Sequence, residues 1–581
     1  MSRQDIGGFV RGEMRGCASV AALVACALLL APAAGEAHEI DLPPSLLGND
    51  GTGAHTPNPL ERPAGCPSAA DESSFTNPDR LLAMNKVMSD FGPRPTGSPA
   101  HERFIDWLER RMSRLAGMSM ESIEHRFDRW TERRSALTVL GGSGEASRVR
   151  VSSAVPYSRA SGGKGRTAPL TYVPPEASID EQDVRGKIVV RDFVPASVPN
   201  AAFTALQWWT YDPDATLTKT IAESYERDWL SGQRQVDLLA AEEVGAAGLV
   251  FVHGFPHEQV KGHYAPYDGV RWGVPAVYVG ADEGAVLKHA AGSGRSGRLE
   301  LAAQEGPATT RTLIATLAGA SEERIVVTSH TDGINAVWDN GPISMLAMAE
   351  HFASLEERCR PRTLQFVFTT GHLFQALGGR GAHDGSARMM AERLDYEYDQ
   401  GTVAAVLAVE HMGARNYEAV PREGHPGRVL VPSGYNEPSS FFFGESPALS
   451  EAVLASVVGH DLRETIALRG ADLPGPHIPP HRSFGGEGGP YHQRLVPTIA
   501  FVTGPWTLFN PAFGMEALDK ALLHDQTLVF ADIAHNLEAL PREVLGGGYL
   551  AYRQARSVLC SSAFGAFGLA DCPSATTTAA D

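Results

Sequence analysis

A histidine and two aspartates lie close together in residues 324–341, which read RIVVTSHTDGINAVWDNG. The β-branched run before His330 has the composition of a buried strand, so it predicts a strand that delivers His330 and Asp332 to its carboxyl end. Asp339 follows, before a glycine and an apolar helix. This arrangement can aim an imidazole and a carboxylate at one metal ion, with Asp332 orienting the ring of His330. A polar strand-to-helix turn is the alternative interpretation, because turns also collect Asp, Asn and Gly.

Two later strands end in further residues that can bind protons or metals. Strands alternate with helices in residues 312–540, which is typical of an α/β fold with a mostly parallel sheet and helices on both faces. Ligands in such sheets bind beyond the carboxyl ends of the strands, so we expect His330, His372 and Glu410 to converge there. The expected strands are residues 324–329, 363–369, 403–409 and 498–502.

These motifs resemble the secreted di-zinc aminopeptidases, a family that includes bacterial leucyl aminopeptidases and glutamate carboxypeptidase. The resemblance is carried by the strand-end His-x-Asp, by Asp-Asn-Gly at residues 339–341 and by a Gly-x-Arg, Gly-Ser segment at residues 92–98. In that family the strand-end histidine and the aspartate of Asp-Asn-Gly bind metal, the aspartate bridging two zinc ions. The resemblance therefore implies a zinc-exopeptidase-like fold in which His330 and Asp339 are metal ligands.

The resemblance also shows where the chemistry differs. The family has two consecutive glutamates, a general base and a ligand of the second zinc, where this chain has His372 and Leu373. Its final ligand histidine falls near Phe509, so the second metal site has lost two ligands. Glu410 takes the place of an aspartate that binds the first zinc. With the two ligands named above it makes three, and three protein ligands with an open position are typical of a catalytic site.

The chain is therefore predicted to bind one divalent metal ion. The resemblance implies zinc, although two carboxylates with one or two histidines also suit iron or manganese. His372 is predicted to act with Asp332 in catalysis, either as general base, since an unperturbed imidazole pKa of about 6.5 suits that task, or as an additional ligand. The remaining candidates bind substrate or support the ligands, and they are His411, Glu487, Tyr491 and His492.

A metallohydrolase that cleaves a peptide or amide bond is the predicted function, with a small ester or lactone as the other substrate class. A catalytically inactive homologue that acts as a binding protein is the second hypothesis. The sequence has no HExxH, GxSxG or GxxxxGK[ST] motif, which argues against other common hydrolase and nucleotide-binding classes. A formal net charge of -18 argues against nucleic acid as a partner.

The N-terminus predicts export. Arginines, an apolar run at residues 18–34 and small residues after it predict a signal peptide over residues 1–37, which would send the mature chain to the periplasm or the medium. A membrane anchor and a lipoprotein anchor at Cys26 are the alternatives, and no stable membrane span is expected after signal removal. Export permits disulfides, and Cys560 with Cys572 is the expected local pair.

The rest of the chain divides by composition. Residues 151–298 resemble the protease-associated domain, a small β-rich module, through three pieces of helix and buried strand. The aromatic segment 207–229 departs from that module and is either a lid over the site or core, with core favoured. Residues 124–140 predict a pair of strands. The predicted divisions are a linker at 38–77, a catalytic domain at 78–150 and 299–545, a protease-associated-like insert at 151–298 and a peripheral tail at 546–581.

Overall fold

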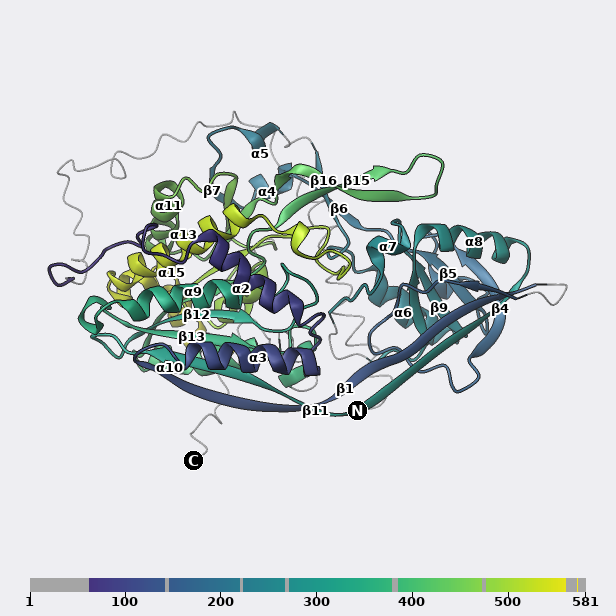
Figure 1. Cartoon of the computed structure of the whole chain (residues 1–581), viewed down its shortest axis with the longest axis horizontal. Helices are drawn as coiled ribbons and strands as arrows, with labels where there is room; N and C mark the ends of the chain where they lie inside the picture. The colour runs from purple at the N-terminus through teal and green to yellow at the C-terminus, as the bar shows by residue number, and fades with distance from the viewer. Residues whose placement is uncertain are drawn as a thin grey trace.

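The computed structural model shows a larger and a smaller body joined by a long ribbon of two strands (Figure 1). The predicted signal peptide, with Cys26, and most of the predicted linker lie outside the described residues. None of the described helices is long and apolar enough to cross a membrane. The structure describes residues 62–141, 146–219, 223–266, 271–378, 385–472, 477–560 and 572.

The larger body is built on a mostly parallel sheet. Its four central strands are adjacent and parallel, and they consist of β-branched and other apolar residues buried on both faces, as parallel strands usually are. All four strands were predicted, three of them to the residue. In spatial order they are β13 (Thr363–Thr369), β12 (Arg324–His330), β14 (Val403–Val409) and β19 (Thr498–Val502).

Helices cover both faces of this sheet. Alternate strand residues point to opposite sides, so apolar side chains on both faces must be covered. Ile325 and Val327 pack in one core with helices from both ends of the chain, whereas Val326 packs in a second core with α10 and α12. The first face carries α2 (Pro78–Asp90), α3 (Pro99–Met112), α9 (Gly341–Ser354), α11 (Pro447–Gly459) and α13 (Lys520–Glu538), and the second carries α10 (Gly385–Asp399) and α12 (Gly489–Gln493).

Three strands extend the sheet at one edge, in the order β17 (Ser439–Phe443), β18 (Thr465–Leu468) and β7 (Gln207–Tyr211). The last of them comes from the range predicted as insert. Its Trp209 is buried in the core of the larger body. This part of the aromatic segment therefore serves as core, the favoured interpretation.

The smaller body holds the other end of the same sheet, with two helices beside it. The predicted turns, strands and helices of this region are present. Its strands lie in the order β3 (Ser153–Ala154), β10 (Ala276–Val279), β9 (Gly248–Val252), β5 (Ile188–Asp192) and β4 (Arg166–Val173), with α6 (Gln233–Glu243) and α8 (Ala281–Gly292) beside them.

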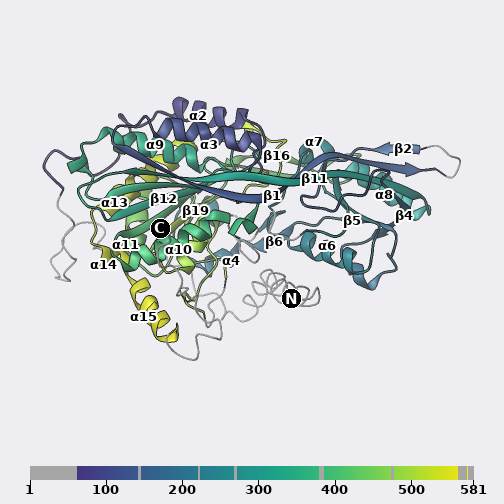
Figure 2. The ribbon, with the colours of Figure 1, turned by 90° about the horizontal axis from the view of Figure 1, so that it is seen from below.

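Two long antiparallel strands, β1 (Met118–Leu140) and β11 (Ser296–Leu317), connect the bodies. One end of β11 pairs with β13 in the larger body and the other end pairs with β4 in the smaller body. Figure 2 shows the two strands side by side along this course. The predicted strand pair at residues 124–140 is therefore wrong: the stretch has no Gly or Pro to make a turn, and it forms one strand whose partner is distant in sequence.

Short elements complete the described structure. They are β2 (Ala146–Val149), β6 (Ala196–Pro199), β8 (Ser224–Arg227), β15 (Arg415–Pro421), β16 (Arg428–Asn436), α4 (Ala201–Thr204), α5 (Thr216–Lys219), α7 (His257–Val260), α14 (Arg542–Gly546) and α15 (Gly548–Cys560), with 3-10 turns η2 (Ile179–Glu181), η3 (Glu357–Cys359), η4 (Gln375–Gly378), η5 (Gly486–Gly488) and η6 (Met515–Ala517).

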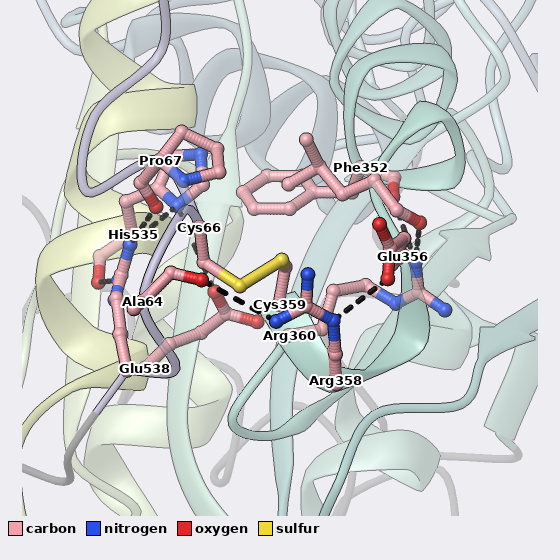
Figure 3. The surroundings of a disulfide bond; sticks show 12 residues. Ala64, Cys66, Pro67, Phe352, Glu356, Arg358, Cys359, Arg360, His535 and Glu538 are labelled. Atoms are coloured by element: carbon pink, nitrogen blue, oxygen red, sulfur yellow. Dashed lines mark hydrogen bonds and ion pairs between the residues drawn. A yellow bond between two sulfur atoms is a disulfide. The ribbon is translucent and has the colours of Figure 1, made fainter.

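The N-terminal end of the described chain is fastened to the larger body. A disulfide joins Cys66, in the range predicted as linker, to Cys359 (Figure 3). The backbone N–H of Ala70 donates to Asp532 at 3.0 Å, so this segment packs on the core and is not an extended spacer. The second disulfide joins Cys560 to Cys572, which confirms the predicted local pair.

Candidate metal centre

Three side chains from neighbouring strands converge beyond the carboxyl ends of the central sheet. His330 is the last residue of β12, Glu410 directly follows β14, and His372 lies three residues beyond the end of β13. Their ligand-capable atoms all lie within 4.8 Å of one another. This confirms the expected convergence of the three residues, and it follows from the parallel order of the strands that carry them.

The ring of His330 is fixed at both nitrogens. Its Nδ1 donates to the main-chain carbonyl of Asp332 at 2.9 Å, and its Nε2 lies 2.9 Å from Oε2 of Glu410. Burial alone would lower the pKa of His330, but the hydrogen bond to Glu410 and the charges of Glu487 and Glu410 outweigh burial and raise that pKa. The raised pKa reflects a surplus of negative charge around the ring.

The carboxylate of Asp332 has a different role from the predicted one. It accepts hydrogen bonds from Thr96 Oγ1 at 2.6 Å and from the backbone N–H groups of residues 371, 372 and 373 at 3.1, 3.2 and 2.8 Å. It therefore fixes the loop that carries His372. The group that orients the ring of His330 is the main-chain carbonyl of the same residue, because the carboxylate is used by the loop.

His372 forms a pair with Glu487. Its Nδ1 lies 2.9 Å from Glu487 Oε1, and Thr369 Oγ1 donates to the other carboxylate oxygen at 3.0 Å. The His372 side chain is 19% exposed, against 2% for Glu487, so the imidazole alone of this pair reaches the surface. Its ring stacks on that of His330, with centroids 4.0 Å apart and planes 12° apart. The structure thus brings the predicted Glu487 to the site.

His411 also lies at the site. Its Nδ1 donates to the main-chain carbonyl of Thr503 at 2.7 Å, and Thr503 Oγ1 donates back to the carbonyl of His411 at 2.6 Å. Its Nε2 lies 3.5 Å from Glu410 Oε2 and has no hydrogen-bond partner among the residues that the structure describes. Burial lowers the pKa of His411 to about 4.

Among the described residues, the group that could hold a metal ion does not include Asp339, a predicted ligand. Its two carboxylate oxygens accept hydrogen bonds from Nε and Nη2 of Arg94, both at 2.6 Å, and both side chains are fully buried. Arg94 also donates to the carbonyls of Met88 and Asn335. Because a bidentate guanidinium matches the geometry and the charge of a carboxylate, Asp339 is already neutralised.

Two predicted substrate-binding residues are likewise used elsewhere. Tyr491 is buried in the apolar core under α10, with its hydroxyl 3.3 Å from Thr328 Oγ1. His492 Nδ1 lies 2.8 Å from the Tyr549 hydroxyl, and its ring stacks on Phe484. Burial lowers the pKa of His492 to about 3, so it is a neutral core residue. Both residues lie on α12, directly after the turn that carries Glu487. They were predicted to bind substrate because they are close to Glu487 in sequence.

Sequence reasoning missed two residues of this region. Arg94 belongs to the Gly-x-Arg, Gly-Ser segment and had no predicted role at the site, although a buried arginine requires an acidic partner. Trp338 packs its ring edge-on to His372, with centroids 5.8 Å apart, and stands in the same motif as Asp339. It belongs to an apolar cluster to which both bodies contribute, made of Ala265, Ile334, Trp338, Leu373, Leu508 and Phe509, with Trp229 and Tyr264 packed against them.

The charges of the site fit a divalent cation. Four carboxylates are buried here, those of Asp332, Asp339, Glu410 and Glu487. Arg94 neutralises one of them, and in the described parts of the chain no lysine or arginine forms an ion pair with the other three. Two imidazoles face Glu410. Nitrogen and carboxylate oxygen are the donors that zinc binds in catalytic sites.

Comparison with known proteins places the fold. No protein-family model and no curated protein sequence matches this chain. Among solved structures, a peptidase M28 precursor from Shewanella amazonensis is 15% identical with a TM-score of 0.55, over 79% of this chain and 92% of that one. BSAP, a zinc aminopeptidase from Bacillus subtilis, is 14% identical with a TM-score of 0.52, over 79% and 94%. The chain therefore has the fold of the M28-type zinc aminopeptidases.

Proposed function

We propose that this protein is an exported, metal-dependent hydrolase of a peptide or amide bond, with one divalent ion, zinc, bound at His330 and Glu410. The observation that carries the proposal is the convergence of two imidazoles and a carboxylate at the carboxyl ends of three parallel strands. Iron or manganese would suit the same donors. A bound ion would polarise a substrate carbonyl and lower the pKa of water.

His372 is the proton acceptor in this proposal. Glu487 accepts a hydrogen bond from Nδ1 of His372, which leaves Nε2 as the basic nitrogen of the neutral ring. Asp332 holds the backbone of the His372 loop through three N–H groups, so the ring has a fixed position. A carboxylate that orients an imidazole is a recurrent arrangement for general base catalysis.

One ion rather than two is supported by the neighbourhood of Asp339. Arg94 supplies a positive charge to both carboxylate oxygens of Asp339, and the guanidinium fills the space beside it. Leu373 and Phe509, at the positions expected to have lost second-site ligands, are buried in the apolar cluster around Trp338. Apolar side chains offer no donor to a second ion.

Export and the smaller body complete the proposal. Two disulfides are consistent with an oxidising compartment such as the periplasm or the medium. We also propose that the smaller body is a protease-associated-like module, on its sequence resemblance. It contributes Tyr264 and Ala265 to the apolar cluster beside the site, so it would help to contact a peptide or small amide substrate.

Metal content of the purified mature protein, measured by elemental mass spectrometry, tests the metal site. We expect about one equivalent, lost in His330→Ala and in Glu410→Gln because each removes a donor. Tyr491→Phe is the matched control, since it lies in the neighbouring core and should keep the ion. Two equivalents would contradict the single site. No binding after addition of zinc, iron or manganese would favour the binding-protein hypothesis.

Hydrolysis tests the chemistry. A screen of aminoacyl anilides, short peptides and esters should find metal-dependent turnover that is lost on chelation. His372→Ala should lower kcat about 100-fold or more, the usual effect of removing a general base. Unchanged kcat in that variant would overturn the role assigned to His372. Cleavage of esters but not of anilides would move the substrate class away from amides.

A further inference from the structure

One nitrogen of the candidate site has no role in the scheme above. Nε2 of His411 is buried and lies 3.5 Å from Oε2 of Glu410, and it has no hydrogen-bond partner in the described parts of the chain. A buried polar atom without a partner is costly, so such an atom in a folded protein needs an explanation. The 5% exposure of the residue leaves little access to solvent.

The tautomer of His411 follows from its other nitrogen. Nδ1 lies 2.7 Å from the carbonyl oxygen of Thr503, so Nδ1 carries the hydrogen. With the hydrogen of the ring on Nδ1, Nε2 presents a lone pair. It points toward a carboxylate oxygen, and two acceptors that face each other repel. A cation between them would satisfy both.

Ring orientation separates the two histidines that could join His330 at an ion. The planes of His330 and His372 are nearly parallel, at 12°, and stacked at 4.0 Å. An imidazole lone pair lies in the plane of its ring, so an ion in one plane lies outside the other. The rings of His330 and His411 stand at 82°, so their planes cross and one ion can lie in both planes.

The backbone brings His411 to that point. Consecutive residues of a strand direct their side chains to opposite sides, yet Glu410 and His411 reach the same place. The chain leaves strand geometry at His411, whose φ of 53° is uncommon for a residue other than glycine. Reciprocal hydrogen bonds with Thr503 fix this conformation. Unusual backbone conformations that are held in this way cluster at functional sites.

We propose that Nε2 of His411 is the third protein ligand of the divalent ion, with His330 and Glu410. The inference rests on the proposed function, since it concerns the same ion. It assigns His372 to proton transfer alone, although distance by itself groups His372 with the other two. Three protein donors then leave an open coordination position for substrate.

Affinity for zinc tests the assignment without any activity assay. Competition with a chelating indicator should show that His411→Ala weakens Zn²⁺ binding about 100-fold or more, as His330→Ala does. His372→Ala should stay within about threefold of wild type. The visible spectrum of the Co²⁺-loaded protein is a second readout. It should change in band position and intensity in the His411 variant and stay unchanged in the His372 variant.

The outcomes separate this inference from the proposed function. If wild type binds neither ion, or if His330→Ala binds like wild type, both are overturned. If His330→Ala fails to bind while His411→Ala binds like wild type, the third ligand alone is overturned, and loss of binding in His372→Ala would name its replacement. His411→Asn guards against misfolding, because asparagine tolerates positive φ and is too short to reach the ion.

Discussion

The candidate site buries histidines beside glutamates. So does the cluster beside the Cys66–Cys359 disulfide, which we call the disulfide cluster and which contains Arg62, His351, His535 and Glu538 (Figure 3). In the disulfide cluster, Arg62, His535 and His351 form a row of hydrogen bonds, whereas the two carboxylate oxygens of Glu538 have no hydrogen-bond partner among the described residues. Arg62 donates to Nδ1 of His535 at 3.2 Å, so Nε2 of His535 carries the hydrogen that it shares with Nε2 of His351 at 2.9 Å. At the candidate site, by contrast, two imidazole nitrogens face one oxygen of Glu410.

The pKa values of the glutamates also differ between the two regions. Burial raises the pKa of Glu538 to about 8, and the charges of three neighbouring arginines oppose this shift only in part. Burial acts in the same direction on Glu410, but the surrounding histidines outweigh it and lower that pKa. Glu538 is therefore neutral at pH 7 and Glu410 is ionised. At the candidate site the ligand atoms of histidine and glutamate converge, and no arginine in the part of the chain that the structure describes balances the negative charge of Glu410. This combination, which the disulfide cluster lacks, indicates a metal site.

The largest expected effect comes from removing Arg94, the arginine that neutralises Asp339. This variant tests whether an arginine balances the charge of a buried carboxylate. Arg94→Met should lower the free energy of unfolding by about 3–5 kcal/mol, because it leaves a fully buried carboxylate without a partner. The double variant Arg94→Met, Asp339→Leu should recover part of that loss. Urea denaturation measures both.

Metal content of the same double variant sharpens the result. It should still bind one equivalent, because Asp339 is outside the proposed ligand set. Loss of the ion in a variant that remains folded would show that Asp339 is a ligand after all.

The disulfide cluster offers a smaller effect that should not reach the site. Cys66→Ser with Cys359→Ser removes a crosslink across 293 residues and should cost about 2–5 kcal/mol of stability. Zinc affinity should remain within about twofold of wild type. The matched control is Cys560→Ser with Cys572→Ser, which opens a separation of 12 residues and should cost less. A large drop in zinc affinity in the first variant would mean that the two regions are coupled.

The titration of Glu538 gives an effect that is spread over several pH units. Its pKa of about 8 lies above the ordinary value of 4.5, so the folded state binds the extra proton. The stability linked to that proton is complete below pH 4.5 and is lost as the pH rises through 8. Between these limits the loss is at most about 1.4 kcal/mol per pH unit.

Glu538→Gln isolates this contribution, because it removes the titrating group and keeps its shape. Denaturation midpoints measured from pH 5 to pH 8 should fall less steeply in the variant than in wild type. His535, whose pKa burial lowers to about 3, acts in the opposite direction and is common to both proteins. Equal slopes would mean that Glu538 titrates in its ordinary range.

The central strands were predictable because they are apolar runs of strand length bounded by polar residues, and β13, β14 and β19 match their predicted bounds. Convergence of three site residues followed from that order. Local pattern could not show the ion pair of Arg94 with Asp339, which joins positions 245 residues apart. The local pattern also could not predict the disulfide between Cys66 and Cys359. Pairing between distant positions produces no periodic pattern in the sequence.

The long ribbon has a mechanical consequence. Because β11 pairs with β13 at one end and with β4 at the other, the hydrogen-bonded β1–β11 ladder is continuous through both bodies. A displacement of one body relative to the other would have to bend this ladder or break its hydrogen bonds. The smaller body therefore cannot be exchanged like a module on a flexible tether. Recombination that replaced it would have to preserve the register of β1 on β11, residue for residue, on both sides of the cut.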